Sequence, residues 1–239
     1  MVIQTLEQPG DPLRTLDRPE PLPFFTGDRL SRAEFERRYH THPEIKKAEL
    51  IEGVVYIQGR VQYRHHAQPH ATLAGWVGLY VSATPGVDGA VNATLRLDNR
   101  NEPQPDVLLR IDHGRSFISA DDYLEGAPEL IVEIAATSAS YDMHDKKLVY
   151  ARNGVREYIV ALTYEQKLHW FVLHEGEYEE LQPGVDGILR SEAFPGLWLQ
   201  ADALWQNDLA GLLAVLQQGV TTPEHARFVE QLNNQAAKA

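Results

Sequence analysis

The chain has 239 residues, 43% of them hydrophobic and 23% charged, which is typical of a globular domain and excludes wholesale disorder. Its 34 acidic and 22 basic residues give a net charge of −12, which excludes a general nucleic-acid coat protein because such a chain repels a polyanion. There is no cysteine, and no apolar run approaches the roughly 18 residues of a membrane span, so thiolate chemistry and a transmembrane role are also excluded. The N-terminal residues do not resemble a secretory signal, and we expect a cytoplasmic protein with no membrane partner.

Prolines dominate the N-terminal part of the chain. Because each proline removes a hydrogen-bond donor and restricts the preceding residue, residues 1–28 are predicted to form an extended arm. Ser31 followed by Glu34 has the spacing of a capping box, in which the two side chains satisfy backbone N–H groups at the start of a helix. This spacing predicts a helix that begins at Ser31 and ends near Tyr39.

Three short strands and a long helix are expected next. β-Branched residues on both sides of Gly53 predict two extended segments within 48–58. Alternation over 93–97 predicts another short strand. Between them, apolar residues at spacings of three and four predict a helix over 68–83 with one buried stripe, formed by Leu73, Trp76, Val77 and Tyr80.

Three continuous apolar runs, at 105–111, 130–136 and 157–162, predict strands that are covered on both faces. A helix is predicted over 143–152, and Gly154 provides its C-terminal stop. A strand, a helix and a strand over about thirty residues are typical of a crossover unit.

A hairpin at 168–181 makes the expected sheet a mixed one. An amphipathic helix over 203–217 and a last helix opened by Pro223 follow. The sequence therefore predicts an α/β fold with a mixed central β-sheet flanked by helices. Its expected parts are an arm at 1–28, one domain at 29–200 and a helical appendage at 201–239.

Two carboxylates lie in or beside the apolar strands. Asp106 opens one predicted strand, and Glu133 lies inside the next, between Val132 and Ile134. A buried lone carboxylate is costly, so it is normally paired, hydrogen-bonded or bound to a metal. Since neighbouring strands lie about 4.8 Å apart, the two side chains could share a divalent cation, and all-oxygen ligation suits Mg²⁺. The alternative is that Glu133 belongs to a structural salt-bridge network.

Two histidines precede or open the long helix. His66 and His70 are four residues apart, the spacing of zinc ligands that face together on a helix. The sequence offers no evident third ligand. A structural pair, or a pair that binds water at the mouth of a site, is therefore the favoured interpretation.

Several motifs occur together in one order. Pro105-Asp106 is followed by Glu133 in its apolar run, by Asp142-x-x-x-Lys146 and by the segment 150–158. Glu49-Leu50-Ile51-Glu52-Gly53 and His70 precede them. This order resembles the Uma-two (Uma2) family of endonucleases, which belongs to the restriction-endonuclease-like PD-(D/E)-x-K superfamily. The resemblance covers about Ser31 to Leu199 and implies a restriction-endonuclease-like core.

The resemblance also implies roles for individual residues. Asp106 and Glu133 are expected to hold Mg²⁺ or Mn²⁺, with Glu49 as a further ligand. Lys146 is expected to offset negative charge at a scissile phosphate, although a solvated helix lysine is the alternative. Glu49 has the corresponding alternative of one charge on a solvated surface. Candidates for auxiliary roles are His70, Asp142 and Ser138.

Two positions depart from the patterns. The superfamily lysine that follows the strand carboxylate by two positions is replaced by Ala135, and the family resembled here places its lysine where Lys146 stands. Ala136 occupies the position of a family serine. Two functions therefore stay open. The first is a metal-dependent endonuclease acting on nucleic acid, with DNA as the leading substrate, and the second is a catalytically inactive nuclease-fold protein that serves as a binding or assembly module.

Assembly is the last expectation. The hairpin at 168–181 and the apolar residues of the C-terminal helices offer more apolar surface than a small appendage needs. The resemblance implies that two copies pair so that two sites face the two strands of a duplex. We therefore expect a homodimer, with a monomer that packs its own tail as the alternative.

Overall fold

The computed structural model describes residues 22–237, so residues 1–21 of the expected arm lie outside the described part. The helical segments are α1 (Arg32–Tyr39), the π-helical turn η1 (Tyr63–Ala67), α2 (Gln68–Ala83), α3 (Ala139–Tyr141), the π-helical turn η2 (Asp142–Lys146), α4 (Lys147–Asn153), α5 (Ala201–Trp205), α6 (Leu209–Val220) and α7 (Pro223–Ala236). The strands are β1 (Ala48–Ile51), β2 (Val54–Ile57), β3 (Val87–Val91), β4 (Leu95–Arg96), β5 (Val107–Ile111), β6 (Phe117–Ile118), β7 (Leu124–Glu125), β8 (Leu130–Ala135), β9 (Glu157–Leu162), β10 (Lys167–His174), β11 (Glu177–Glu180), β12 (Leu189–Arg190) and β13 (Trp198–Leu199).

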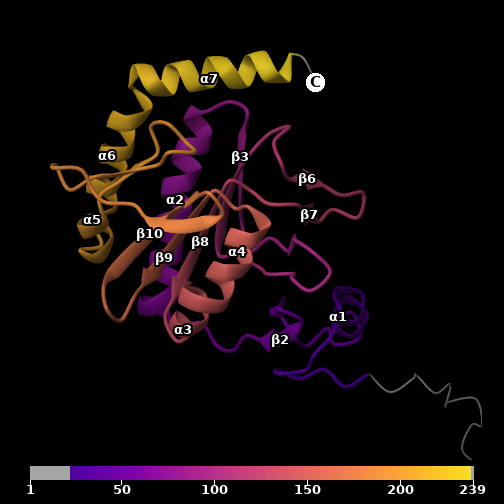
Figure 1. The fold of residues 1–239 in the computed structure, drawn as a ribbon. Helices are drawn as coiled ribbons and strands as arrows, with labels where there is room; N and C mark the ends of the chain where they lie inside the picture. Colours follow the sequence, from indigo (N-terminus) through magenta and orange to yellow (C-terminus); the bar gives the residue numbers. More distant parts are fainter. Residues whose placement is uncertain (1–21, 238–239) are drawn as a thin grey trace, which may run out of the picture.

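A six-stranded sheet with the order β11-β10-β9-β8-β5-β3 forms the centre of the fold. Its strands pair in antiparallel fashion except β8 and β9, which are parallel and joined by the helical segment α3-η2-α4. This is the expected crossover unit, and the mixed α/β sheet flanked by helices is confirmed (Figure 1).

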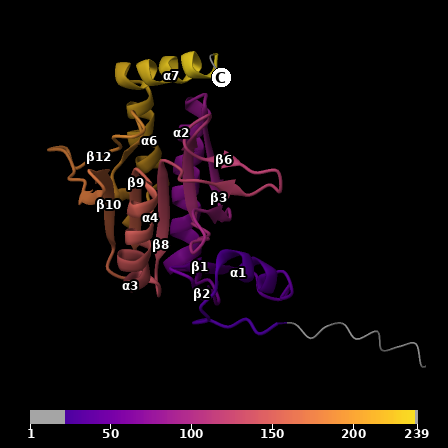
Figure 2. The ribbon, with the colours of Figure 1, turned by 45° about the vertical axis from the view of Figure 1, so that its right-hand side comes forward.

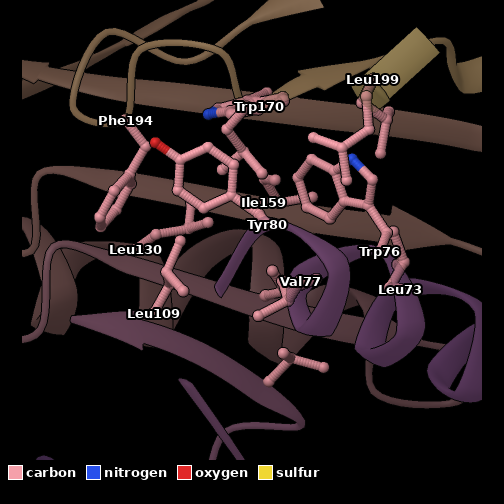
Figure 3. Packing of buried hydrophobic residues seen from close by; sticks show 14 of the residues in the cluster. Leu73, Trp76, Val77, Tyr80, Leu109, Leu130, Ile159, Trp170, Phe194 and Leu199 are labelled. Atoms are coloured by element: carbon pink, nitrogen blue, oxygen red, sulfur yellow. The ribbon is translucent and has the colours of Figure 1, made fainter. Parts of the chain in front are cut away.

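Helices cover both faces of this sheet, with α4 on one side and α2 and α6 on the other (Figure 2). Because successive strand residues point to opposite faces, each strand contributes to two cores. Figure 3 shows the α2 side, where Trp76 and Tyr80 pack against Leu109, Leu130 and Ile159. The buried stripe expected on the long helix is thus confirmed.

A small third core lies under α1 and the β1–β2 hairpin, to one side of the sheet (Figure 1). Ser31 caps α1, since its hydroxyl accepts the backbone N–H of Glu34 at 3.4 Å. The Glu34 carboxylate binds Arg37 and Arg38 rather than completing a capping box. The hairpin joins the rest of the molecule where Leu50 and Glu102 form a β-bridge.

The helix expected over 143–152 begins earlier than predicted. It starts at Ala139 and runs through the π-helical turn η2 before α4 continues to Asn153. Apolar periodicity could not reveal this start, because the first turns carry polar side chains that face the interior. Gly154 ends α4 with φ +80°, as its identity predicts.

The single helix expected over 203–217 is wrong. Asn207 adopts a left-handed φ of +57°, and Asp208 caps a new helix by accepting the Gly211 N–H at 2.9 Å. α5 and α6 are therefore separate, and Leu204, Leu212 and Leu216 share the main core on the α2 side. Strand β3 and the short strands β6, β7, β12 and β13 were not anticipated.

Within residues 22–237, no helix is both long enough and apolar enough to traverse a bilayer.

Candidate active site

Strand register places Asp106 and Glu133 on the same face of the sheet. β5 and β8 pair with Val107 opposite Val132, so one further step sets Asp106, which directly precedes β5, opposite Glu133. Ile131, two residues before Glu133 and on the same face, packs in the core beneath α4. Both carboxylates line one cavity of about 360 Å³.

Lys146 reaches into this cavity from η2. Its ammonium lies 2.8 Å from Glu133 Oε1, 2.9 Å from Glu49 Oε1 and 3.5 Å from Asp142 Oδ1. Only 1% of the residue is exposed, so the alternative of a solvated helix lysine is wrong. One ammonium thus joins three acids from β1, β8 and η2.

Two π-helical turns flank the site. The wider turn of η2 turns both Asp142 and Lys146 inward, where both are buried. η1, which leads into α2, carries His66 on the cavity wall. Such turns occur frequently at functional sites, because they change the direction of a few side chains without ending the helix.

Glu49 is buried, and the alternative of a solvated surface charge is wrong. Its Oε1 accepts hydrogen bonds from the Lys146 ammonium at 2.9 Å and from the Gln104 backbone N–H at 2.7 Å. Its Oε2 accepts a hydrogen bond from Gln58 Nε2 at 2.7 Å. Both carboxylate oxygens therefore already have protein partners. This arrangement makes Glu49 an anchor for Lys146.

Asp106 is held by three neighbours. Its Oδ2 accepts the Ile134 backbone N–H at 2.8 Å and lies 3.4 Å from His66 Nε2, while its Oδ1 lies 3.3 Å from Lys47 Nζ. Burial by itself raises the pKa of Asp106, but His66, Lys47 and the backbone donor outweigh it and lower that pKa. Asp106 is therefore a carboxylate under ordinary conditions.

The acids around Lys146 respond to burial and to one another. Burial, with a further contribution from Asp106, Asp142 and Glu49, raises the pKa of Glu133 to about 8 against the opposing effect of Lys146. Burial acts in the opposite direction on Lys146, yet the surrounding carboxylates raise its pKa well above the usual lysine value. The ammonium is charged, and it is shared by more acids than it can neutralise.

Four carboxylates but only two ammonium groups line the cavity. The acids Glu49, Asp106, Glu133 and Asp142 face Lys47 and Lys146. Arg60 also lines the cavity, so when all seven groups are ionised the balance is minus four plus three, or minus one. Surplus negative charge in a site of low dielectric favours a further cation.

Other predicted residues lie at the edge of this arrangement. Ser138 lines the cavity, and its backbone carbonyl oxygen accepts the Asp142 backbone N–H at 2.9 Å. His70 is not part of the cavity lining, and it lines a neighbouring groove of about 390 Å³. Its Nε2 lies 2.9 Å from the backbone carbonyl oxygen of Asp106, so it contacts the site through the main chain.

Sequence reasoning missed three contributors. Tyr150 is buried and donates its hydroxyl to Glu133 Oε1 at 2.9 Å, and Tyr158 donates its hydroxyl to the Asp142 backbone carbonyl at 3.0 Å. Lys47 reaches Asp106. Its position two residues before Glu49, on the same side of an extended segment, was the available signal.

Comparisons with known proteins agree with this architecture. The model of the Uma2 family, described as "Putative restriction endonuclease", matches residues 32–202. A crystal structure of "a putative nuclease belonging to DUF820 from Anabaena variabilis ATCC 29413" superposes with a TM-score of 0.54 at 16% identity, covering 66% of this chain and 89% of the other. No curated protein matches the chain. The structural likeness establishes the fold, and the family match spans more than half of the sequence. The chain therefore belongs to the Uma2 family.

Proposed function

We propose that this protein is a metal-dependent endonuclease that hydrolyses phosphodiester bonds in nucleic acid, with DNA as the leading substrate. The observation that carries the proposal is the cavity in which Asp106 and Glu133 lie on one face of the sheet beside a buried lysine. The family described as "Putative restriction endonuclease" and the neighbour of the same fold described as "a putative nuclease" support it. As part of the same proposal, we place the enzyme in the cytoplasm. Proteins of that reducing compartment rarely contain disulfides, and this chain has no cysteine with which to form one.

The donor set fits a hard divalent cation such as Mg²⁺ or Mn²⁺. Asp106 and Glu133 offer carboxylate oxygens, and the surplus of buried acids over ammonium groups supplies the charge. These two residues would hold the metal, and Glu49 would keep Lys146 in place. When bound, the ion polarises a phosphoryl oxygen and lowers the pKa of an attacking water.

Lys146 supplies the second electrostatic element. Its ammonium is fixed by Glu49, Glu133 and Asp142, so it needs no reorganisation when a phosphate enters. Negative charge that develops on the phosphate would be stabilised by this group. Arg60 and Lys47 at the cavity wall add positive charge on the approach for a phosphate backbone.

The test compares cleavage of plasmid DNA by the wild type and by Glu133→Gln, with Mg²⁺ or Mn²⁺. We expect the substitution to lower the rate by about a hundredfold or more, because it removes a charged ligand. Single-stranded DNA and RNA are assayed in parallel to define the substrate.

The matched control is Glu157→Gln in β9. Glu157 is also a buried strand glutamate, but its oxygens accept the backbone N–H groups of Glu192 and Ala193, the Ser191 hydroxyl and Trp170 Nε1. It belongs to the opposite face of the sheet, so its substitution is expected to lower stability and to leave the cleavage rate of the folded protein unchanged. An unchanged rate in Glu133→Gln would contradict the proposal.

A catalytically inactive nuclease-fold protein remains the second candidate. Ala135 and Ala136 follow Glu133, where related patterns carry a lysine and a serine. This candidate predicts binding of nucleic acid without cleavage under any divalent metal. Filter binding with the same substrates therefore separates the two functions.

A further inference from the structure

A side-chain cluster that connects the start of α2 with Asp106 is not explained by the proposed function. His66, His70 and Asp106 each offer one ligand atom, and these atoms all lie within 4.8 Å of one another. Among residues 22–237, this is the group of three or more histidine, cysteine or acidic side chains whose ligand atoms come this close together. The group includes neither Glu49 nor Glu133. The two histidines lacked a third ligand in the sequence, and the fold supplies Asp106.

We propose that His66, His70 and Asp106 bind a divalent transition metal, represented by Zn²⁺, next to the acidic site at Glu133. This inference does not depend on endonuclease activity, because binding of the ion is measured directly. It assigns a ligand role to His66, which the family resemblance did not include.

The spacing fits tetrahedral coordination. Bonds of about 2.0–2.1 Å to zinc place neighbouring ligand atoms of a tetrahedron about 3.3–3.4 Å apart. The distance from His66 Nε2 to Asp106 Oδ2 is 3.4 Å, which matches this value and is long for a hydrogen bond. Since the whole set spans up to 4.8 Å, side-chain shifts of about 1.5 Å complete the site.

The contacts around the histidines suit metal ligation. His70 donates a ring N–H at Nε2 to the Asp106 carbonyl oxygen, 2.9 Å away, which leaves the lone pair on Nδ1. A backbone carbonyl that fixes the other nitrogen is the usual second contact of a zinc-bound histidine. His66 Nδ1 is buried without a hydrogen-bond partner in the described part of the chain. The two rings meet at 85° with centroids 5.8 Å apart, so they approach from different directions.

An ion can reach this cluster from solvent. His66 lines both the 360 Å³ cavity and the adjacent 390 Å³ groove, and 21% of its side chain is exposed. His70 lines the groove, and Asp106 lines the cavity. The Oδ2 atom of Asp106 faces His66, whereas the Oδ1 atom faces the Lys47 ammonium.

The donor types determine which metal is favoured. Imidazole nitrogens suit Zn²⁺ and its transition-metal neighbours, whereas Mg²⁺ prefers oxygen ligands and retains its waters. We therefore expect Zn²⁺ to bind at this cluster in the presence of excess Mg²⁺. One tight ion per chain is the expected stoichiometry, with three protein ligands and an open fourth position.

The experiment titrates Zn²⁺ into untagged, chelator-treated full-length protein by calorimetry, and repeats the titration with Co²⁺ to record the visible absorption of tetrahedral cobalt. His66→Ala and His70→Ala are each expected to raise the dissociation constant for Zn²⁺ by about tenfold or more and to weaken the cobalt bands. His65→Ala is the matched control, because His65 is in the same turn but stacks on Tyr164 at 4.3 Å. Circular dichroism verifies the fold of each variant, and His66→Gln replaces His66→Ala if the latter does not fold.

Absence of tight Zn²⁺ binding, or binding that survives both histidine substitutions, would overturn the proposal. Loss of binding in His65→Ala would overturn it as well, because the ion would then depend on a histidine outside the cluster. Failure of the endonuclease proposal is a separate result, recorded as absence of cleavage with Mg²⁺ or Mn²⁺ while Zn²⁺ titrations are unaffected.

Discussion

Two buried strand glutamates behave differently because of what their oxygens contact. Glu157 accepts backbone N–H groups and neutral side-chain donors, and it holds the segment 191–193 against β9. Glu133 contacts an ammonium and the Tyr150 hydroxyl, and it lines a cavity. Burial raises the pKa of both, so burial alone does not identify a functional acid. The cavity and the buried ammonium beside Glu133 make that distinction.

Removal of the Lys146 ammonium is expected to be costly for stability. Lys146→Met leaves Glu49, Glu133 and Asp142 without their cation, and breaking such a buried ion pair costs about 3–5 kcal/mol. Urea unfolding at pH 7 measures this loss. The loss should be smaller at pH 5, where the uncompensated acids can take up protons.

The neighbouring lysine provides the control for this prediction. The Lys147 ammonium lies 3.6 Å from the centroid of the Phe171 ring, so Lys147→Met should cost only about 1 kcal/mol. Equal losses in the two variants would contradict the assignment of Lys146 as a shared buried cation.

Glu102 is expected to make stability depend on pH. Burial, together with the neighbouring Glu36 carboxylate, raises the pKa of Glu102 from 4.5 to about 9. Between these values the unfolded chain releases a proton that the folded chain retains, so the free energy of unfolding should fall as the pH rises from 4.5 to 9.

Urea unfolding of the wild type and Glu102→Gln at pH 5, 7 and 9 tests this dependence. The substitution removes the titrating group, and the pH profile should become flatter. Glu165→Gln, at an exposed position, should leave the profile unchanged. A profile that is identical in the wild type and Glu102→Gln would show that Glu102 does not retain its proton.

At the scale of the elements, glycine favours a left-handed helix end but destabilises a helix interior. Gly154 ends α4 with φ +80°, and a Cβ there would lie 2.8 Å from Arg115 Nη2. Gly75 lies on the exposed side of α2, and a Cβ there would meet no atom within 4 Å. The two glycines therefore form a matched pair.

We expect Gly154→Ala and Gly75→Ala to change stability in opposite directions. The first should lower the free energy of unfolding by about 1–2 kcal/mol, because an L-residue is strained in the left-handed region. The second should raise it by about 0.5–1 kcal/mol, because alanine restricts the unfolded chain and favours the helix. Thermal or urea unfolding of both variants measures the signs, and a stabilised Gly154→Ala would contradict the C-terminal role of Gly154.

At the scale of the whole molecule, the C-terminal helices complete the main core. Leu204, Leu212 and Leu216 are buried against the α2 side of the sheet, so most of the apolar surface that was expected to drive pairing is covered within one chain. The expectation of a homodimer therefore rests on the resemblance to paired restriction-type folds.

Light scattering at micromolar concentration tests this expectation. A homodimer should have about twice the mass of the 27.0 kDa chain. A constant mass of one chain across the concentration range would contradict the dimer and would favour the monomer with a self-packed tail. Cleavage of both strands in one encounter would then require two separate particles.

Local patterns determined most of the elements. The stripe of α2, the hairpins, the glycine stop of α4 and the continuous apolar runs of β5, β8 and β9 depend on neighbours within a few residues, so the sequence alone predicted them. The break between α5 and α6 depends on the left-handed backbone at Asn207, which apolar periodicity does not report. The short strands β6 and β7 pair with each other, and β7 also pairs with β4, 29 residues earlier in the chain. Each of these strands has two residues, which are too few to carry a periodic signal.

The candidate site divides in the same way. Asp106, Glu133 and Lys146 could be selected from the sequence, because charges beside apolar runs and a motif order are visible there. The tertiary structure alone decided that Glu49 anchors Lys146, that Tyr150 donates to Glu133, and that Asp106 lies beside His66. These contacts join residues up to 97 positions apart. Sheet register and helix packing determine which of these residues meet, and the spacing of residues along the sequence does not reveal it.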